Sequence, residues 1–250
     1  MSEMSDKEKL QKLEKEFEEF LYIISHDFAA PLRHINGFVS IIEQDKNNQL
    51  DDQTSLYLKN ISKSSEHLDA MLQGLLKLSR INTRPGEKTQ TSLSDIFQAA
   101  WYRDLRKLIP DDAILNITQM PEYFGDEDQL QQAFYAILLN CIQYRNPTGG
   151  LEINITHQID GDMHVIAVED NGIGIHPKMT ERVLKPFTRA VSASDYPGLG
   201  MGLAIAKKVI EHHDGSIGIE IGENGGTCVT IRLPKVADNE KSPEAIQPLD

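Results

Sequence analysis

The chain has 250 residues, of which 25 are Lys or Arg and 38 are Asp or Glu, so its formal net charge is −13. That acidic balance argues against broad attraction to nucleic acid or to anionic membranes, but it leaves room for a nucleotide pocket built from a few local donors. The two cysteines, Cys141 and Cys228, do not make a disulfide framework, and no apolar run approaches the roughly 20 residues that span a bilayer. We therefore expect a cytoplasmic protein whose 40% hydrophobic residues suffice for folded domains.

The first third of the chain has the pattern of two long helices. Apolar residues recur every three or four positions from Leu10 to Ile42 and again from about Asp52 to Ile81, with a polar break between them. This period predicts an antiparallel helical hairpin. A hairpin alone buries only one seam, so we expect a second copy of the chain to complete a four-helix bundle. The alternative is a helical pair that packs on the rest of its own chain.

The remainder mixes helix and strand patterns. Ser92-Leu93-Ser94-Asp95 resembles a capping box and predicts a helix to about Leu108, and Asp126 caps another helix that runs to about Arg145. Strands are expected at 113–118, 151–159, 164–169, 216–221 and 227–233, and a further helix at 203–212. Helices interleaved with antiparallel strands predict an α/β sandwich, with the helices on one face of a mixed, mainly antiparallel sheet.

Two glycine-containing segments suit a nucleotide. In Asp170-Asn171-Gly172-Ile173-Gly174 a carboxylate at a strand end can accept a hydrogen bond from an exocyclic amine, and the glycines let a flat ligand approach closely. In Gly198-Leu199-Gly200-Met201-Gly202 alternating glycines precede a helix, so that backbone N–H groups can face phosphate oxygens. Each segment taken alone also fits an ordinary loop.

Two helical positions carry further candidate chemistry. Asn140 lies with Gln143 and Tyr144 on a polar stripe of its helix, where an amide oxygen can ligate Mg²⁺ and an aromatic ring can lie against a base. His26 stands beside Asp27 on the first long helix, in a position that suits a nucleophile. The alternatives are an ordinary polar helix face and an ordinary surface histidine.

Taken in order, these segments resemble the core of a sensor histidine kinase. The family's H box is matched by 25–32, its N box by Asn140 and its neighbours, its G1 box by 170–174, its F box by 185–187 and its G2 box by 198–202. The resemblance covers about residues 15–234 and implies a dimerisation and phosphotransfer hairpin joined to an ATP-binding α/β sandwich. The expected divisions are a signalling coiled-coil helix over 1–20, the hairpin over 21–82, a linker over 83–90, the ATP-binding domain over 91–235 and a disordered tail over 236–250.

The same resemblance implies roles for single residues. His26 is the phosphoacceptor, Asp27 holds its ring or takes its proton, Asn140 binds Mg²⁺, and Asp170 binds adenine N6. The other implied nucleotide contacts are Gln143, Tyr144, Gly172, Gly174, Phe187, Gly198, Gly200 and Gly202. A mobile lid is expected over 188–197. The implied activity is autophosphorylation of His26 from ATP and transfer to an Asp of a response regulator, with a sensor domain or a separate sensor protein upstream.

Three positions depart from the family pattern. Ala136 replaces a second Asn, and Gln143 replaces a Lys, so a scaffold that binds a regulator without using ATP stays open as an alternative. Ala136 also lacks the carboxylate with which related ATPases activate water, and this disfavours a hydrolytic ATPase. Ala30 stands where many members carry a polar residue used in dephosphorylating the regulator, so we expect poor phosphatase activity.

Overall fold

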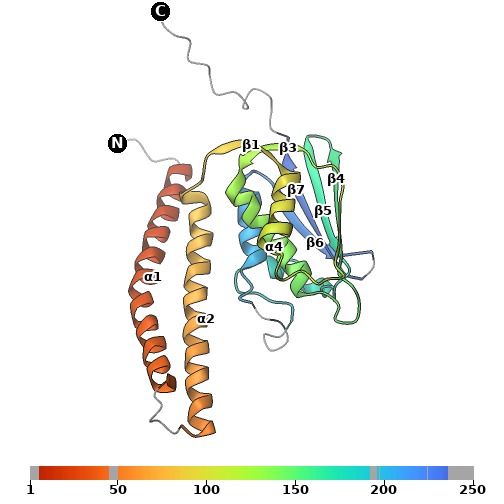
Figure 1. Cartoon of the computed structure of the whole chain (residues 1–250). Coiled ribbons are helices and arrows are strands. Elements are labelled where there is room, and N and C mark those ends of the chain that lie inside the picture. The colour runs from red at the N-terminus through yellow and green to blue at the C-terminus, as the bar shows by residue number, and fades with distance from the viewer. Residues whose placement is uncertain (1–5, 45–49, 192–195, 197, 224, 236–250) are drawn as a thin grey trace, which may run out of the picture. The chain divides into compact units, whose positions relative to one another are not determined.

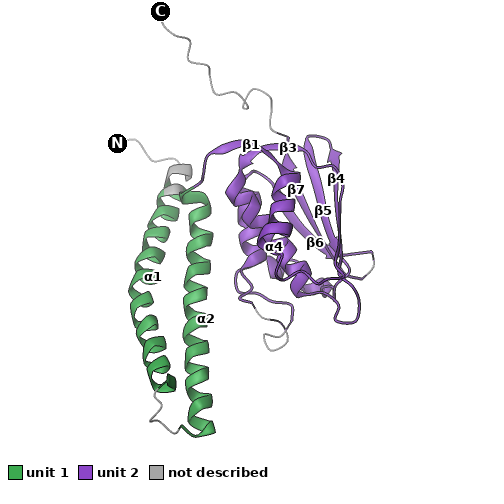
Figure 2. Ribbon diagram, in the orientation of Figure 1, with its two compact units in different colours: residues 1–84 green, residues 85–250 purple. Residues whose placement is uncertain are grey.

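A computed structural model describes residues 6–44, 50–191, 196, 198–223 and 225–235, without the side chains of residues 6–8 and 11. The chain divides into two compact units, Met1–Arg84 and Pro85–Asp250 (Figure 2). The described part of the first unit is helical, and the second unit contains all the strands of the described residues (Figure 1). The expected tail, 236–250, lies outside the described residues.

The helical unit is the expected hairpin of α1 (Asp6–Gln44) and α2 (Asp52–Thr83). Helix α1 continues through Pro31, so the coiled-coil pattern at its start and the segment around His26 belong to one helix. Asp51 caps α2, because its Oδ1 accepts a hydrogen bond of 2.7 Å from the N–H of Thr54. The seam between the two helices is mainly apolar and buries Leu21, Leu32, Val39, Leu58, Leu76 and Ile81.

The second unit is built on the expected mixed sheet. Its strands are β2 (Ile114–Ile117), β4 (Glu152–Asp160), β5 (Met163–Asp170), β6 (Ser216–Ile221) and β7 (Thr227–Pro234). They lie in the order β2-β4-β5-β7-β6, in which β2 is parallel to β4 and all the other pairs are antiparallel. Alternate residues such as Ile153 and Ile155 of β4 are fully buried, which is the period of a strand with one face in the core.

Helices pack on this sheet and supply the rest of the core. They are α3 (Leu93–Gln98), α4 (Glu127–Gln143) and α5 (Gly202–His212), with short 3₁₀ turns η2 (Pro177–Met179) and η3 (Arg182–Leu184). The expected N-cap is present, since the N–H of Asp95 donates to Ser92 Oγ over 3.2 Å. The rings of Phe97 and Phe134 stack with centroids 4.0 Å apart. The sandwich of helices and sheet is therefore the architecture that the sequence predicts.

The helix expected to reach Leu108 is different in the structure. After Gln98 it continues as a π-helix, η1 (Ala99–Asp104), and Leu105 N–H donates to the carbonyl of Ala100. Ala100, Trp101 and Leu105 are all buried. These apolar side chains recur every three or four residues with Ile96 and Phe97, so the core face is the one that the sequence predicts, while the π-helical turn itself is not predicted.

A two-stranded sheet joins the start of this unit to α4. It pairs β1 (Lys88–Ser92) antiparallel with β3 (Glu122–Asp126), and neither strand was expected. The expected linker, 83–90, therefore contains the last residue of α2 and the first three residues of β1. Only residues 84–87 lie outside regular structure there.

Candidate functional site

Strand β5 ends at Asp170, whose carboxylate is held in the interior by backbone donors. Its Oδ1 accepts hydrogen bonds from the N–H groups of Gly172, over 2.8 Å, and Thr227, over 3.3 Å. Burial raises the pKa of Asp170, and these two bonds partly offset that rise because they favour the charged form. Both backbone bonds go to the same oxygen.

The loop after Asp170 packs directly on two other elements. The N–H of Ile173 donates to the carbonyl of Tyr144 over 2.9 Å. A side chain at Gly172 would collide with that same carbonyl, and one at Gly226 would collide with the carbonyl of Asp170. These glycines therefore allow the loop, the end of α4 and the start of β7 to meet.

Helix α4 brings its predicted polar residues to this place. Asn140, Gln143 and Tyr144 are each half-buried at its end, and Tyr144 caps the helix with an N–H bond of 2.9 Å to the carbonyl of Asn140. Within the described residues, the side-chain amide of Asn140 has no hydrogen-bond partner. It is thus available to a ligand.

The second glycine segment approaches the same helix end. Gly198 and Gly200 have positive φ angles of 133° and 71°, and Gly202 begins α5. A Cβ on Gly202 would lie 3.5 Å from Cβ of Ala136, and a Cβ on Gly198 would lie 3.9 Å from Oε1 of Gln143. The residues from both glycine segments and from α4 therefore meet around one helix end.

Arg189 ties the segment before α5 together. Its Nη1 donates to the carbonyl of Gly198 over 2.9 Å, and its Nη2 donates to the carbonyl of Tyr196. The ring of Tyr196 lies 5.2 Å from the ring of Tyr144, at a tilt of 48°. Most of the expected lid, at 192–195 and 197, lies outside the described residues.

Phe187, in the segment that resembles the F box, has a backbone that few residues with a side chain adopt. Its φ is 57°, in the left-handed region, and the turn is closed by a bond of 3.3 Å from Thr188 N–H to the carbonyl of Lys185. Its side chain is 37% exposed. Such a conformation is costly and is found mainly where the surrounding structure imposes it.

Sequence reasoning missed Arg189, Thr227 and Gly226 as parts of this site. Gly226 belongs to 222–226, which has the composition of a hairpin turn, and nothing local indicates that it abuts Asp170. Arg189 is one of many arginines, and only the fold places it against two carbonyl groups. These residues are recognised as part of the site only from their tertiary contacts.

His26 and Asp27 lie in the helical unit, on α1. Both side chains are exposed, at 75% and 67%, and His26 Nδ1 lies 3.1 Å from Asp27 Oδ1. Pro31 has no N–H, so the carbonyl of Asp27, one turn earlier, lacks its usual helix bond. The imidazole is therefore accessible and is held by a neighbouring acid.

Two family models match the chain, one on each unit. Residues 18–84 match the "His Kinase A (phospho-acceptor) domain", and residues 125–237 match the "Histidine kinase-, DNA gyrase B-, and HSP90-like ATPase". Among the described residues, no helix is both long enough and apolar enough to cross a bilayer.

Curated relatives match most of the chain. The phytochrome-like protein Cph1 of Synechocystis is 28% identical over 225 residues, which are 90% of this chain and 30% of that protein. The methanogenesis regulatory histidine kinase FilI of Methanothrix harundinacea is 32% identical over 220 residues, 88% of this chain and 25% of that protein. The chain thus spans about a quarter to a third of these relatives.

Solved structures share the fold. Full-length ShkA in complex with AMPPNP superposes with a TM-score of 0.61 over 86% of this chain and 45% of that chain, at 22% identity. The mycobacterial sensor histidine kinase MprB superposes with a TM-score of 0.51 over 59% of this chain and 97% of that chain, at 26% identity.

Proposed function

Because this chain belongs to the sensor histidine kinases, with their phospho-acceptor domain followed by their ATPase domain, we propose that it phosphorylates itself on His26 from ATP and passes the phosphoryl group to an Asp of a response regulator. The observation that carries the proposal is that one chain contains both halves of the reaction. On α1, the exposed imidazole of His26 lies beside the carboxylate of Asp27. In the second unit, two glycine segments and the side-chain amide of Asn140 meet around the end of α4.

The contact between His26 and Asp27 supports Nε2 as the ring nitrogen that reacts. A neutral imidazole carries one proton, and the carboxylate at 3.1 Å favours that proton on Nδ1. The lone pair of Nε2 then attacks the terminal phosphorus of ATP, an N–P bond forms, and the bond to the bridging oxygen breaks as ADP leaves. Asp27 stabilises the positive charge that develops on the ring, or takes the Nδ1 proton.

The second unit offers groups for each part of the nucleotide. Asp170 is proposed to accept a hydrogen bond from the adenine N6 amine, since its carboxylate is fixed by two backbone donors at a strand end. Tyr144 is proposed to lie against the base beside Gly172 and Gly174. The remaining proposed contacts are Phe187 at the start of the lid, and Gln143, Gly198, Gly200 and Gly202 near the phosphates.

The residues of this unit also fit a magnesium ion that accompanies the nucleotide. Within the described residues, no group of three or more His, Cys, Asp or Glu side chains is able to hold a metal by itself. Asn140 supplies a hard amide oxygen without another partner, so it would hold the ion jointly with phosphate oxygens. When bound, the ion neutralises phosphate charge during the transfer.

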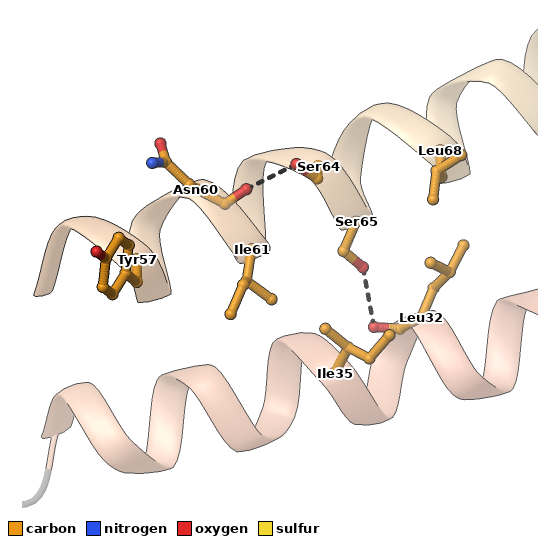
Figure 3. A pocket seen from close by; sticks show the side chains of 8 residues that line it. All are labelled: Leu32, Ile35, Tyr57, Asn60, Ile61, Ser64, Ser65 and Leu68. Atoms are coloured by element: carbon orange, nitrogen blue, oxygen red, sulfur yellow. Dashed lines mark hydrogen bonds between the residues drawn. The ribbon is translucent and has the colours of Figure 1, made fainter. Parts of the chain in front are cut away.

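An apolar groove on the helical unit supports the proposed homodimer. Figure 3 shows this groove, which has a volume of about 530 Å³ and runs between α1 and α2. It is lined by Leu32, Ile35, Tyr57, Asn60, Ile61, Ser64, Ser65 and Leu68. Ile35, Ile61 and Leu68 are 41%, 47% and 52% exposed, and a second hairpin would remove them from water.

The test is incubation with γ-labelled ATP. Acid-labile label is expected on the wild-type chain and not on His26→Ala, whereas His34→Ala, which changes another exposed histidine of α1, keeps the label. Release of phosphate without labelled protein would support a hydrolytic ATPase instead. If the chain is not labelled and releases no phosphate, but binds a receiver domain, the scaffold alternative is supported. Passage of the label to a receiver domain tests the second transfer.

A further inference from the structure

A short segment, residues 84–87, connects the two units, and it is bound at both ends. The anchor at its start belongs to the helical unit, and the anchor at its end belongs to the sheet-containing unit. Each anchor is a buried carboxylate, and each was invisible in the sequence because its partner is distant along the chain.

The first anchor is Glu18 on α1. Its side chain is only 6% exposed, and its Oε1 lies 2.7 Å from Nε of Arg84, which caps α2, and 3.9 Å from Nε of Arg80. Nearby, Asn82 Nδ2 donates to Glu14 Oε1 over 2.8 Å. A buried carboxylate is costly without a cation beside it, so Glu18 holds Arg84 against α1, the helix that also carries His26.

The second anchor is Asp126, which is 3% exposed. Its Oδ2 accepts a bond of 2.6 Å from the N–H of Gly86, while its Oδ1 accepts the N-cap bond of 3.1 Å from Gln129 N–H. A Cβ at Gly86 would lie 2.8 Å from Oδ2, so glycine is the residue that permits this contact. One carboxylate therefore fixes both the connecting segment and the start of α4, the helix that ends at the nucleotide site.

Between the two anchored residues stands only Pro85, whose ring restricts its own φ. We propose that Glu18 and Asp126 are positioning residues for the phosphorylation of the acceptor histidine: they confine the movement of the nucleotide-binding unit to the few backbone torsions around Pro85. The inference rests on the proposed function. A shorter free segment raises the effective concentration at which one unit meets the other, so loss of an anchor slows phosphoryl transfer without altering how ATP is held.

Asp126→Asn separates the linker bond from the helix cap. Asparagine remains a good N-cap through its Oδ1, but its Nδ2 then opposes the N–H of Gly86, donor against donor. We expect the rate at saturating ATP to fall about fivefold, with the half-saturating ATP concentration changed by less than about twofold. Gly86→Ala, whose Cβ would displace the Asp126 carboxylate, should also lower the rate. The matched control is Asp128→Asn, an exposed acid in the same first turn.

Glu18→Gln tests the other anchor, with the exposed neighbour Glu19→Gln as its control. The same fall in rate at unchanged half-saturation is expected, because the amide keeps the shape of the side chain and loses the charge that holds Arg84. The two anchors limit the same segment, so the double variant Glu18→Gln with Asp126→Asn should be slower than either single variant.

Amide hydrogen exchange measures whether the hydrogen bond of the Asp126 anchor is intact, independently of kinase activity. Gly86 N–H should exchange faster in Asp126→Asn than in wild type, and at the wild-type rate in Asp128→Asn. Three results would each overturn the proposal. They are equal exchange of the Gly86 N–H in wild type and Asp126→Asn, an unchanged or increased rate of labelling, and a rise in the half-saturating ATP concentration that accounts for the whole effect. Label that persists in His26→Ala would instead refute only the assigned acceptor, because the anchors would still be tested on whichever residue is labelled.

Discussion

The backbone N–H of Asp126 donates to Nε2 of His213 over 3.0 Å, so this imidazole must be neutral where it lies. Its other nitrogen, Nδ1, lies 2.8 Å from the carbonyl of Val209 and donates to it. His213 is 2% exposed at the end of α5. A proton on Nε2 would face the Asp126 N–H, donor against donor, and would loosen the junction of α4 with α5.

This geometry predicts a loss of stability in mild acid. Burial is the main cause that lowers the pKa of His213 below its usual 6.5, so the unfolded chain takes up a proton at a pH where the folded chain does not. Stability should be complete above about pH 6.5, fall as the pH drops below it, and level off below the folded pKa. Thermal melting between pH 8 and 5 measures this.

The control is His213→Gln, which can still accept from Asp126 and does not titrate. Burial also lowers the pKa of the neighbouring His212, which adds a decline of the same sign in both proteins. If the melting temperature of the wild type falls with decreasing pH no more steeply than that of His213→Gln, the prediction is contradicted.

Asn140→Ala should greatly slow magnesium-dependent labelling. The variant loses the amide oxygen that is proposed to ligate the ion, and we expect the labelling rate to fall at least about 100-fold. Binding of ADP in the presence of a chelator should stay within about twofold of wild type, since no other contact changes. Asn116→Ala, an exposed amide on β2, serves as the matched control and should label normally.

Asp170→Asn should remove the preference for an adenine amine. The variant retains one oxygen for the N–H groups of Gly172 and Thr227, while its amide nitrogen opposes the N6 donor. We expect ATP affinity to fall at least about tenfold, whereas affinity for inosine triphosphate, which lacks that amine, changes little. Competition against a fluorescent nucleotide measures both, and an equal loss for the two nucleotides would argue against the assignment.

Leu68→Glu should weaken the proposed homodimer. Its side chain lines the groove of Figure 3 and is 52% exposed in the single chain, so a charge there would be buried at the interface. We expect the dissociation constant of the dimer to rise at least about tenfold in sedimentation experiments. Lys63→Glu, on the exposed polar side of α2, changes charge without entering the groove and should leave association intact.

Ala30→Thr should add a regulator phosphatase activity, which we expect the wild-type chain to perform poorly. Ala30 is half-buried one turn after His26 and has no side-chain donor that orients a water molecule. A hydroxyl there should speed dephosphorylation of a receiver domain about tenfold or more. Ala29→Thr is the matched control. Rapid dephosphorylation by the wild-type chain, without ATP, would contradict the expectation.

The features that sequence reasoning predicted are those with a local cause. The hairpin follows from a helix period, the cap at Ser92 follows from its own side chain, and the five-stranded sheet follows from alternating residues between turns. The pairing of β1 with β3 and the π-helix after Gln98 depend on what those segments meet in the folded chain. The same holds for the site: its motifs are readable, but the contacts of Arg189, Gly226 and Asp126 are made across the fold.

Ala136 presents only a methyl group to the start of α5, where a Cβ on Gly202 would be 3.5 Å away. That position is 8% exposed and holds neither acid nor base. A nucleotide bound here would meet no group at residue 136 that recruits a water molecule against its terminal phosphate. Without an acceptor imidazole, we expect the bound ATP to remain unhydrolysed. The chain should therefore consume ATP when it signals and not whenever its nucleotide site is occupied.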